Sequence, residues 1–374
     1  MAGVYIHIPY CRQKCNYCNF FSVVSRKSAP EIIGAICREI DIRTSSKNLS
    51  VETLYLGGGT PSLLDKRLLS QLFDTLNRQF SISEGSEITL EANPDDINPD
   101  NLSFWKSIGI NRLSIGIQSF RDEDLKYLNR VHSAETAIDC IRLAREFGFP
   151  DLTIDLIYGI PTLSDNHWIE NLQLFQSLSL PHLSAYALTV EPKTPLFRQI
   201  AVGKAKSVDE QQSANQFMIL MEFMRNHGYL HYEISNFCKP GHFAKHNVSY
   251  WKGVDYYGFG PSAHSYYDNK REWNVSSVTE YLNALNQGLI PSESEELTEI
   301  DRYNEYVMTG LRTMWGCDSA IIKDRFGEAS EAYFQSRTTK WSRYMTRDES
   351  RYTLNDEGKL LADGIASDLF QIEP

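Results

Sequence analysis

The sequence predicts an α/β protein: a partial (β/α)6 barrel followed by a small, mainly helical C-terminal domain. The length of 374 residues exceeds what one compact core normally holds. A strand-like apolar run followed by an amphipathic helical stretch recurs about six times, which is typical of right-handed βα units. After about residue 292 the chain becomes acidic and polar, and the segments beyond it have helical periodicity.

Six short apolar runs are the predicted barrel strands. They cover residues 4–8, 53–56, 87–91, 112–117, 152–157 and 183–189. Between the second and third runs, residues 65–80 have apolar side chains at helical spacing, which we expect to pack against the sheet. These side chains are Leu68, Leu69, Leu72, Phe73, Leu76 and Phe80.

The ends of the predicted strands are polar or rich in glycine. In βα barrels the chemistry takes place at the C-terminal rim, so we expect these strand ends to face one mouth. Taken one at a time, the polar residues also have structural interpretations, as a helix cap, a partner for backbone groups or a turn residue. The residues concerned are Gly57, Gly58, Gly59, Thr60, Glu91, Gln118 and Asp155.

Composition limits the classes of partner. Hydrophobic residues make up 42% of the chain, charged residues 23%, and no apolar run reaches the ~18 residues expected of a membrane span. The first ten residues, MAGVYIHIPY, lack an export signal, so we expect a cytoplasmic protein with reduced thiols. The net charge of -11 argues against a nucleic-acid partner.

Three of the seven cysteines form a C-x3-C-x2-C group after the first strand: Cys11, Cys15 and Cys18. Thiolates on one short loop suit an iron–sulfur cluster or another soft metal centre. Structural zinc is the alternative, but it needs four ligands, and His7 is the fourth candidate nearby. The other cysteines are scattered, and we expect them in the core. They are Cys37, Cys140, Cys238 and Cys317.

A four-iron cluster held by three thiolates leaves one iron open to the amino and carboxylate groups of an amino-acid-like cofactor. Gly57 to Thr60 would let backbone approach such a ligand, or would form a turn without one. The run matches neither common nucleotide-binding glycine motif. Glu91 and Asp155 could accept hydrogen bonds from hydroxyl or ammonium groups, and Arg130 could hold a carboxylate.

Five segments together resemble the radical S-adenosylmethionine core of the coproporphyrinogen dehydrogenase family: YIHIPYCRQKCNYCNFFS, LGGGTPS, EANPDD, RLSIGIQSF and DLIYGIP. The resemblance covers roughly residues 1–290. It implies a TIM-like radical SAM barrel with a [4Fe-4S] cluster on Cys11, Cys15 and Cys18, and S-adenosylmethionine on the open iron. The cofactor contacts that it implies are Tyr5, Tyr17, Gly58, Gly59, Thr60, Glu91, Gln118, Arg130, Asp155 and, on the sixth strand, Thr189.

Two branches of that family share this core: oxygen-independent coproporphyrinogen III oxidases and heme chaperones. The oxidase pattern has a further cysteine where this chain has Phe20, and a longer segment ahead of the cysteine loop. The stretch KHNVSYWKG resembles the H-N-x-x-Y-W motif of the heme chaperones. The resemblance thus favours a protein that binds heme and delivers it to hemoprotein acceptors over an enzyme that decarboxylates coproporphyrinogen III. A simple iron–sulfur electron-transfer protein is a third hypothesis.

The motif match implies His246 as a heme ligand, with Tyr250 and Trp251 offering flat surfaces to the macrocycle. A histidine beside aromatic residues is also common in a core or at a helix cap. Three neighbours remain alternative ligands for heme or metal: His231, Cys238 and His242.

The predicted domains are a core barrel at 1–230, a segment closing its mouth at 231–292 and a winged-helix-like domain at 293–374. Residues 256–267 resemble the glycine- and serine-rich part of the closing segment, where His264 could contact heme or be a satisfied polar residue. The composition of residues 292–301 indicates a linker or the start of a helix. The last domain could serve as a lid or as a docking surface for a partner. The resemblance also leaves two points open: whether the acceptors are membrane-bound respiratory enzymes, and whether the protein is a homodimer.

Overall fold

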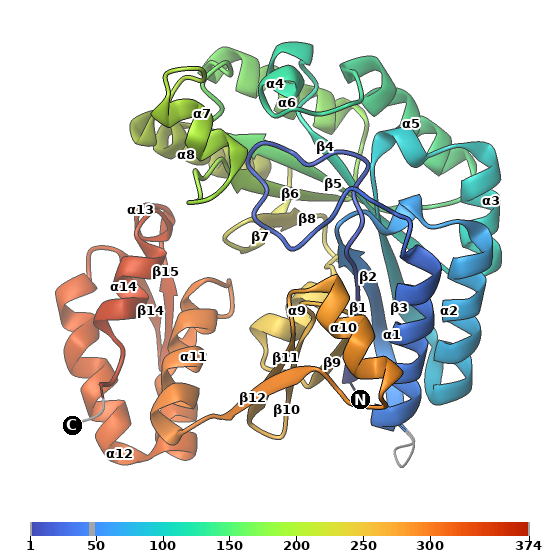
Figure 1. The fold of residues 1–374 in the computed structure, drawn as a ribbon. Coiled ribbons are helices and arrows are strands. Elements are labelled where there is room, and N and C mark those ends of the chain that lie inside the picture. Colours follow the sequence, from blue (N-terminus) through green and yellow to red (C-terminus); the bar gives the residue numbers. More distant parts are fainter. Residues whose placement is uncertain (1, 45–48, 373–374) are drawn as a thin grey trace.

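The computed structural model describes residues 2–44 and 49–372. This part of the chain forms a large α/β body and a smaller C-terminal domain (Figure 1). Each has its own cluster of buried apolar side chains, so each has its own hydrophobic core. None of the described helices is both long and apolar enough to cross a membrane.

Six parallel strands, paired in chain order, carry the large body. The six predicted runs are confirmed, and most of the strands extend beyond them. They are β1 (Ala2–Ile8), β2 (Leu49–Gly58), β3 (Phe80–Ala92), β4 (Arg112–Gln118), β5 (Asp151–Tyr158) and β6 (His182–Ala187). Because β6 ends at Ala187, Thr189 lies beyond the sixth strand and not on it, which corrects the sequence-based expectation.

Helices cover the outer face of this curved sheet (Figure 1). On α2 the predicted apolar face is buried, and the Asp65 carboxylate caps the helix by accepting a hydrogen bond from Leu68 N. The helices of this body up to residue 226 are α1 (Ala29–Thr44), α2 (Lys66–Gln79), α3 (Pro99–Ser107), α4 (Asp122–Tyr127), α5 (Ala134–Glu146), α6 (Asp165–Ser177), α7 (Pro195–Ala201) and α8 (Glu210–Asn226).

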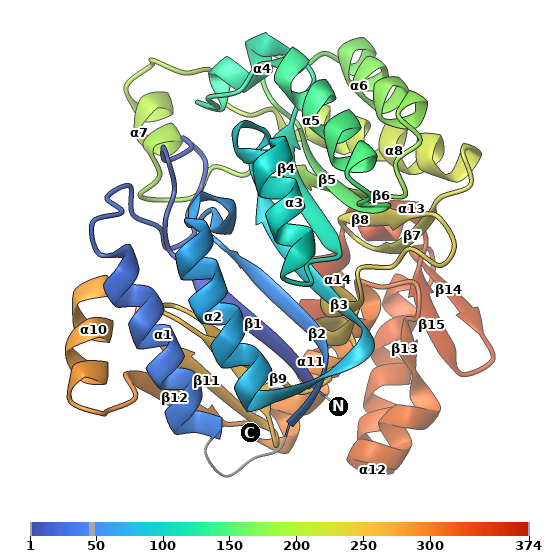
Figure 2. The ribbon, with the colours of Figure 1, turned by 90° about the vertical axis from the view of Figure 1, so that its right-hand side faces the viewer.

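The sheet does not close into a full barrel. Among the described residues it has twelve strands in the order β12-β11-β10-β9-β1-β2-β3-β4-β5-β6-β8-β7. The added elements are β7 (Leu230–Glu233), β8 (Asn236–Cys238), α9 (Lys245–Trp251), β9 (Tyr256–Phe259), β10 (His264–Tyr267), β11 (Lys270–Asn274), α10 (Val278–Asn286) and β12 (Ser292–Glu296). Strand β9 pairs with β1 in parallel, so β9 to β12 extend the sheet beyond β1 (Figure 2). We call these four strands the sheet extension.

The acidic segment that the sequence suggested as a linker is therefore partly a strand, β12, paired with β11. The other interpretation of this segment, the start of a helix, is confirmed directly after β12. Thr298 caps α11 (Glu299–Leu311) in a capping box with Asp301.

A buried carboxylate on α1 fixes the turn between β9 and β10. Glu39 is fully buried, and its oxygens accept hydrogen bonds from Gly260 N (2.8 Å), Asn274 Nδ2 (2.7 Å), Tyr281 Oη (2.5 Å) and Arg43 Nη1 (3.1 Å). A buried charge is tolerated when it is paired and hydrogen-bonded in this way. The network ties the sheet extension to the helix that follows the cysteine loop.

The C-terminal domain combines helices with a small antiparallel sheet of order β13-β15-β14. After α11 come β13 (Cys317–Asp318), α12 (Ser319–Thr338), β14 (Met345–Asp348), β15 (Arg351–Leu354), α13 (Asp356–Lys359) and α14 (Ala362–Asp368). Gly327, with φ +85°, interrupts α12 and divides it into two helical stretches.

Candidate functional site

The loop between β1 and α1 carries the three clustered cysteines, all partly exposed. Its backbone is anchored where Cys11 N donates to Val23 O at 3.0 Å. Two polar side chains reach the sulfurs: the Thr60 hydroxyl lies 3.7 Å from Cys11 Sγ, and Arg130 Nη1 lies 3.2 Å from Cys15 Sγ. The loop thus presents its thiols at the carboxyl ends of the strands, as the sequence predicts.

A cavity of about 910 Å³, which we call the cysteine cavity, opens beside this loop. Twelve of the predicted site residues line it together, although they come from separate strand ends and loops. They are Cys11, Cys15, Tyr17, Cys18, Gly58, Gly59, Thr60, Glu91, Gln118, Arg130, Asp155 and Thr189. The two predicted site residues that do not line it are Tyr5 and His246.

The glycines at the end of β2 allow close packing against the cysteine loop. A Cβ atom on Gly59 would lie 2.6 Å from Tyr10 O, and one on Gly58 would lie 2.6 Å from His7 Cε1. Gly58 also has φ +106°, which favours glycine. A larger residue at either position would push the strand end and the loop apart.

Two carboxylates face the cavity from β3 and β5. Glu91 accepts hydrogen bonds from Tyr55 Oη at 2.8 Å and from Gly58 N at 3.1 Å, and burial raises its pKa. Burial, followed by the nearby Glu91, raises the pKa of Asp155 to about 7. Both groups can accept hydrogen bonds from hydroxyl or ammonium groups of a ligand.

Arg130 joins the cysteine loop to the strands. Its Nη2 donates to Asn93 Oδ1 and to Gly116 O, each at 2.7 Å, while Nη1 points at Cys15 Sγ. Arg130 Nε is buried and has no hydrogen-bond partner within the described chain. At the end of β4, Gln118 has φ +71°, so the strand turns sharply where it meets the cavity.

The donor set fits a thiolate-bound iron–sulfur cluster. Three thiols on one loop, a guanidinium beside a sulfur and an unpartnered buried N–H are suited to an anionic, sulfur-rich group. In residues 2–44 and 49–372 no three His, Cys, Asp or Glu side chains are grouped as one metal ion would require. His7, the fourth zinc ligand considered, has its ring nitrogens hydrogen-bonded to Tyr5 Oη (3.2 Å) and Phe21 O (3.0 Å).

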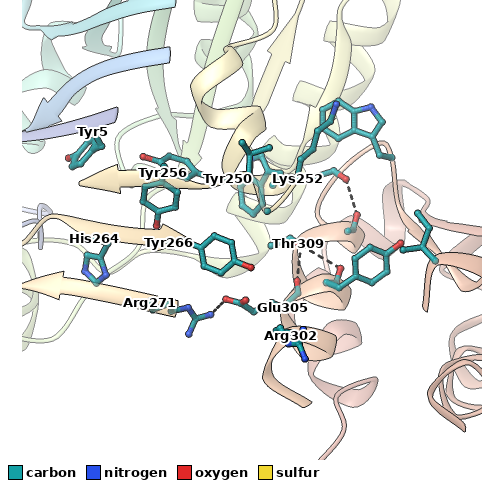
Figure 3. Close-up of a pocket in the computed structure, with 18 of the residues that line it drawn as sticks. Tyr5, Tyr250, Lys252, Tyr256, His264, Tyr266, Arg271, Arg302, Glu305 and Thr309 are labelled. Carbon is teal, nitrogen blue, oxygen red and sulfur yellow. Dashed lines mark hydrogen bonds and ion pairs between the residues drawn. The ribbon is translucent and has the colours of Figure 1, made fainter. Parts of the chain in front are cut away.

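A second cavity of about 910 Å³, the aromatic cavity, lies between the sheet extension and the C-terminal domain (Figure 3). Nine Phe, Tyr and Trp side chains line it, and Tyr5 is one of them. Phe20 lines both cavities. Sequence reasoning did not predict this second cavity, although the tyrosine-rich stretch 256–267 was a signal for part of it.

His246 lies in α9, where it is buried against β2, and it lines neither of these cavities. Its Nδ1 is 2.8 Å from Thr53 Oγ1, its Nε2 is 2.8 Å from Tyr250 Oη, and its ring stacks on Tyr55. Burial lowers its pKa to about 3. Neither ring nitrogen can bind iron in this arrangement unless one of these hydrogen bonds breaks. Tyr250 and Trp251, from the same motif, do line the aromatic cavity.

The alternative ligands near His246 are also engaged. His231 stacks on Phe237 with ring centres 4.1 Å apart, and His242 Nδ1 lies 2.8 Å from Asp151 Oδ1. Cys238 is buried, and so are Cys37, Cys140 and Cys317, which confirms the prediction of core cysteines.

Comparison with known proteins places these features in a family. Residues 5–175 match the family model of the radical SAM superfamily, and residues 297–361 match that of the HemN C-terminal domain. The chain is 34% identical over 372 residues to the heme chaperone HemW of Bacillus subtilis, with 98% of each chain covered. It is 31% identical over 373 residues to HemW of Mycobacterium tuberculosis, covering 98% of this chain and 94% of the relative.

A solved structure has the same fold over nearly the whole chain. It is the coproporphyrinogen III oxidase HemN of Escherichia coli, a radical SAM enzyme, with a TM-score of 0.86 and 25% identity. The match covers 99% of this chain and 90% of the oxidase. The predicted fold class, a partial radical SAM barrel with a C-terminal domain, is confirmed.

Proposed function

This chain belongs to the HemW family of heme chaperones, and on that basis we propose that it binds heme and transfers it to hemoprotein acceptors. The observation that carries the proposal is the near full-length similarity to HemW relatives, which includes the C-terminal domain. The aromatic cavity supports it, because a mainly apolar cavity of this size falls within the range that holds cofactors.

We further propose that Cys11, Cys15 and Cys18 hold a [4Fe-4S] cluster, with S-adenosylmethionine exchanging at its open iron. When bound, the cluster can supply an electron to S-adenosylmethionine. The chain's own residues bind and orient this pair. Arg130 donates toward a cysteine sulfur, and the glycines at the end of β2 bring backbone close to the site.

The remaining residues of the cysteine cavity give S-adenosylmethionine its polar contacts in this proposal. Glu91 and Asp155 accept hydrogen bonds from its hydroxyl and ammonium groups, and Gln118 can donate or accept. Tyr17, Thr60 and Thr189 complete the wall of the cavity. Tyr5 faces the aromatic cavity, so we assign it no contact with this cofactor.

The test of heme binding is an absorbance titration of the purified protein with heme, at a fixed cluster content. We expect saturation near one heme per chain with a shifted Soret band. Addition of an acceptor apo-hemoprotein should then move the band to the spectrum of the acceptor. A titration without saturation, indistinguishable from free heme, would remove the chaperone proposal.

The second candidate function is the oxidative decarboxylation of coproporphyrinogen III, which the HemN fold over 99% of the chain favours. Its test uses the cluster-loaded protein with S-adenosylmethionine, a reductant, an electron acceptor for the substrate radical, and coproporphyrinogen III, without oxygen. Conversion of two of the propionate side chains to vinyl groups, with release of carbon dioxide, would establish the enzyme. An intact cluster without product would exclude it.

A further inference from the structure

The walls of the aromatic cavity come from two parts of the molecule. One side carries Tyr256 and Tyr266 from the sheet extension (Figure 3). Tyr306 from α11 of the C-terminal domain also lines the cavity. Trp251 and Trp315 add two indole rings. Flat aromatic rings on opposite walls suit a flat, apolar ligand, because stacking and burial then act on both of its faces.

His264 is the imidazole that the fold leaves available in this cavity. It begins β10, is exposed, and its ring lies beside that of Trp273 with the centres 6.4 Å apart. Within the described chain its ring nitrogens make no hydrogen bond, whereas the other imidazole in the cavity, His7, has both nitrogens engaged. An unengaged imidazole in an aromatic cavity can ligate a metal centre.

The backbone of His264 is held firmly. A Cβ atom on Gly258 would lie 2.0 Å from His264 O, so the two strands of the hairpin approach closely only because glycine stands there. Arg43 Nη1 also donates to Gly258 O at 2.8 Å, and Arg43 is paired with the buried Glu39. The imidazole is therefore presented from a rigid strand pair, as a ligand position requires.

The charge of the cavity is opposite to that of the whole chain. Its lining has five Lys and Arg side chains and two carboxylates, in a protein of net charge -11. Arg271 is paired with Glu295 and Glu305. Three other arginines have no carboxylate partner among the described residues: Arg302, Arg325 and Arg351. Guanidinium groups that line a mainly apolar cavity and have no carboxylate partner suit a ligand with carboxylate groups.

We infer that heme occupies the aromatic cavity, with a ring nitrogen of His264 on its iron and its propionates against Arg302, Arg325 and Arg351. This inference rests on the proposed function, and it names the site and the ligand that carry it. It also gives the H-N-x-x-Y-W motif a different role: Tyr250 and Trp251 line the site, while His246 holds α9 against Thr53.

The experiment compares wild type with His264→Ala, His246→Ala and, as a surface control, His167→Ala, each titrated with heme at equal cluster content. We expect His264→Ala alone to lose the Soret band of the histidine-ligated complex, and added imidazole to restore it. His264→Tyr should give the spectrum of a phenolate-ligated heme instead. These spectral changes report the iron ligand, which a change in folding alone would not produce.

Metal-free protoporphyrin IX tests the cavity without the iron bond. Its fluorescence titration should be unchanged in His264→Ala. Arg302→Gln and Arg351→Gln should each weaken it about threefold, as expected for partly exposed ion pairs. Arg142→Gln, an exposed arginine on α5, should leave it unchanged.

The outcomes separate the two claims. If wild type binds heme and His264→Ala gives the same spectrum, the ligand assignment is overturned while the chaperone proposal stands. If His246→Ala alone loses the band and imidazole restores it, His246 is the ligand and the inference is overturned. If wild type binds no heme at all, the proposed function fails, and the inference fails with it.

Discussion

Replacing Asp155 by asparagine should stabilise the protein in the absence of S-adenosylmethionine. The Asp155 side chain points from β5 into the cysteine cavity, where Glu91 faces it from β3, and burial and Glu91 raise its pKa to about 7. Ser114, Ser184 and Arg130 also face it and oppose the shift without cancelling it. An ionised Asp155 is therefore unfavourable in the empty cavity, and an asparagine of the same shape avoids that charge.

The size of the effect follows from the pKa. Raising the pKa of a fully desolvated carboxyl from the ordinary aspartate value of 3.8 to about 7 corresponds to a free energy of ~4 kcal/mol. Asp155 is partly exposed to the cavity, so we reduce this to about 2 kcal/mol. The native state binds the proton more tightly than the unfolded chain. Stability is therefore lost as pH rises from about 4 to 7, and the gain from asparagine should be complete above pH 7 and smaller at pH 5.

Urea unfolding of wild type and Asp155→Asn at pH 5 and pH 8, at matched iron content and without added S-adenosylmethionine, measures this gain. Asp74→Asn, on the exposed side of α2, is the matched control, and we expect a change within about 0.5 kcal/mol. An Asp155→Asn variant that is no more stable than wild type at pH 8, or equally stabilised at both pH values, would refute the reasoning.

Two further changes test the packing around the sites. Tyr281→Phe removes a hydrogen bond to the buried Glu39 and should lower the free energy of unfolding by about 2 kcal/mol in urea. Tyr344→Phe, whose hydroxyl makes no hydrogen bond within the described chain, should change it little; equal losses would contradict this role of Glu39. Gly59→Ala forces a Cβ against Tyr10 O, so it should cost about 1–3 kcal/mol and lower the iron bound per chain. Gly364→Ala, where that atom meets open space, should lose no iron, and iron binding by Gly59→Ala at the wild-type level would show that the close packing is not needed.

Local patterns in the sequence predicted much of the fold. The barrel strands and α2 have strong periodicity, and the cysteine spacing and the glycine run identify residues that act close to their own position in the chain. The principle that functional groups gather at strand ends then brought Glu91, Gln118 and Asp155 to the same cavity. Each of these predictions needed information from short stretches only.

Contacts between segments that are far apart in the chain could not be predicted from such local patterns. β12 is highly acidic and lacks an apolar pattern, yet it pairs at the sheet edge because β11 offers partners such as Arg271. His246 was predicted as a ligand from its neighbours in sequence, but its partner Thr53 lies 193 residues away. The aromatic cavity likewise joins Tyr5 to Tyr306, and no periodicity relates two such positions.

The central place of β1 in the sheet has a consequence for how the protein is made. β1 comes before both of its partners in the chain: β2 soon covers one of its edges, but the other edge pairs with β9, which begins at Tyr256. At ordinary rates of translation that partner emerges roughly 10 to 50 seconds later. Until then an apolar strand next to the cysteine loop has an open edge, which is a site for aggregation. The pairing of the sheet around the cysteine loop is therefore complete only when β9 has been made.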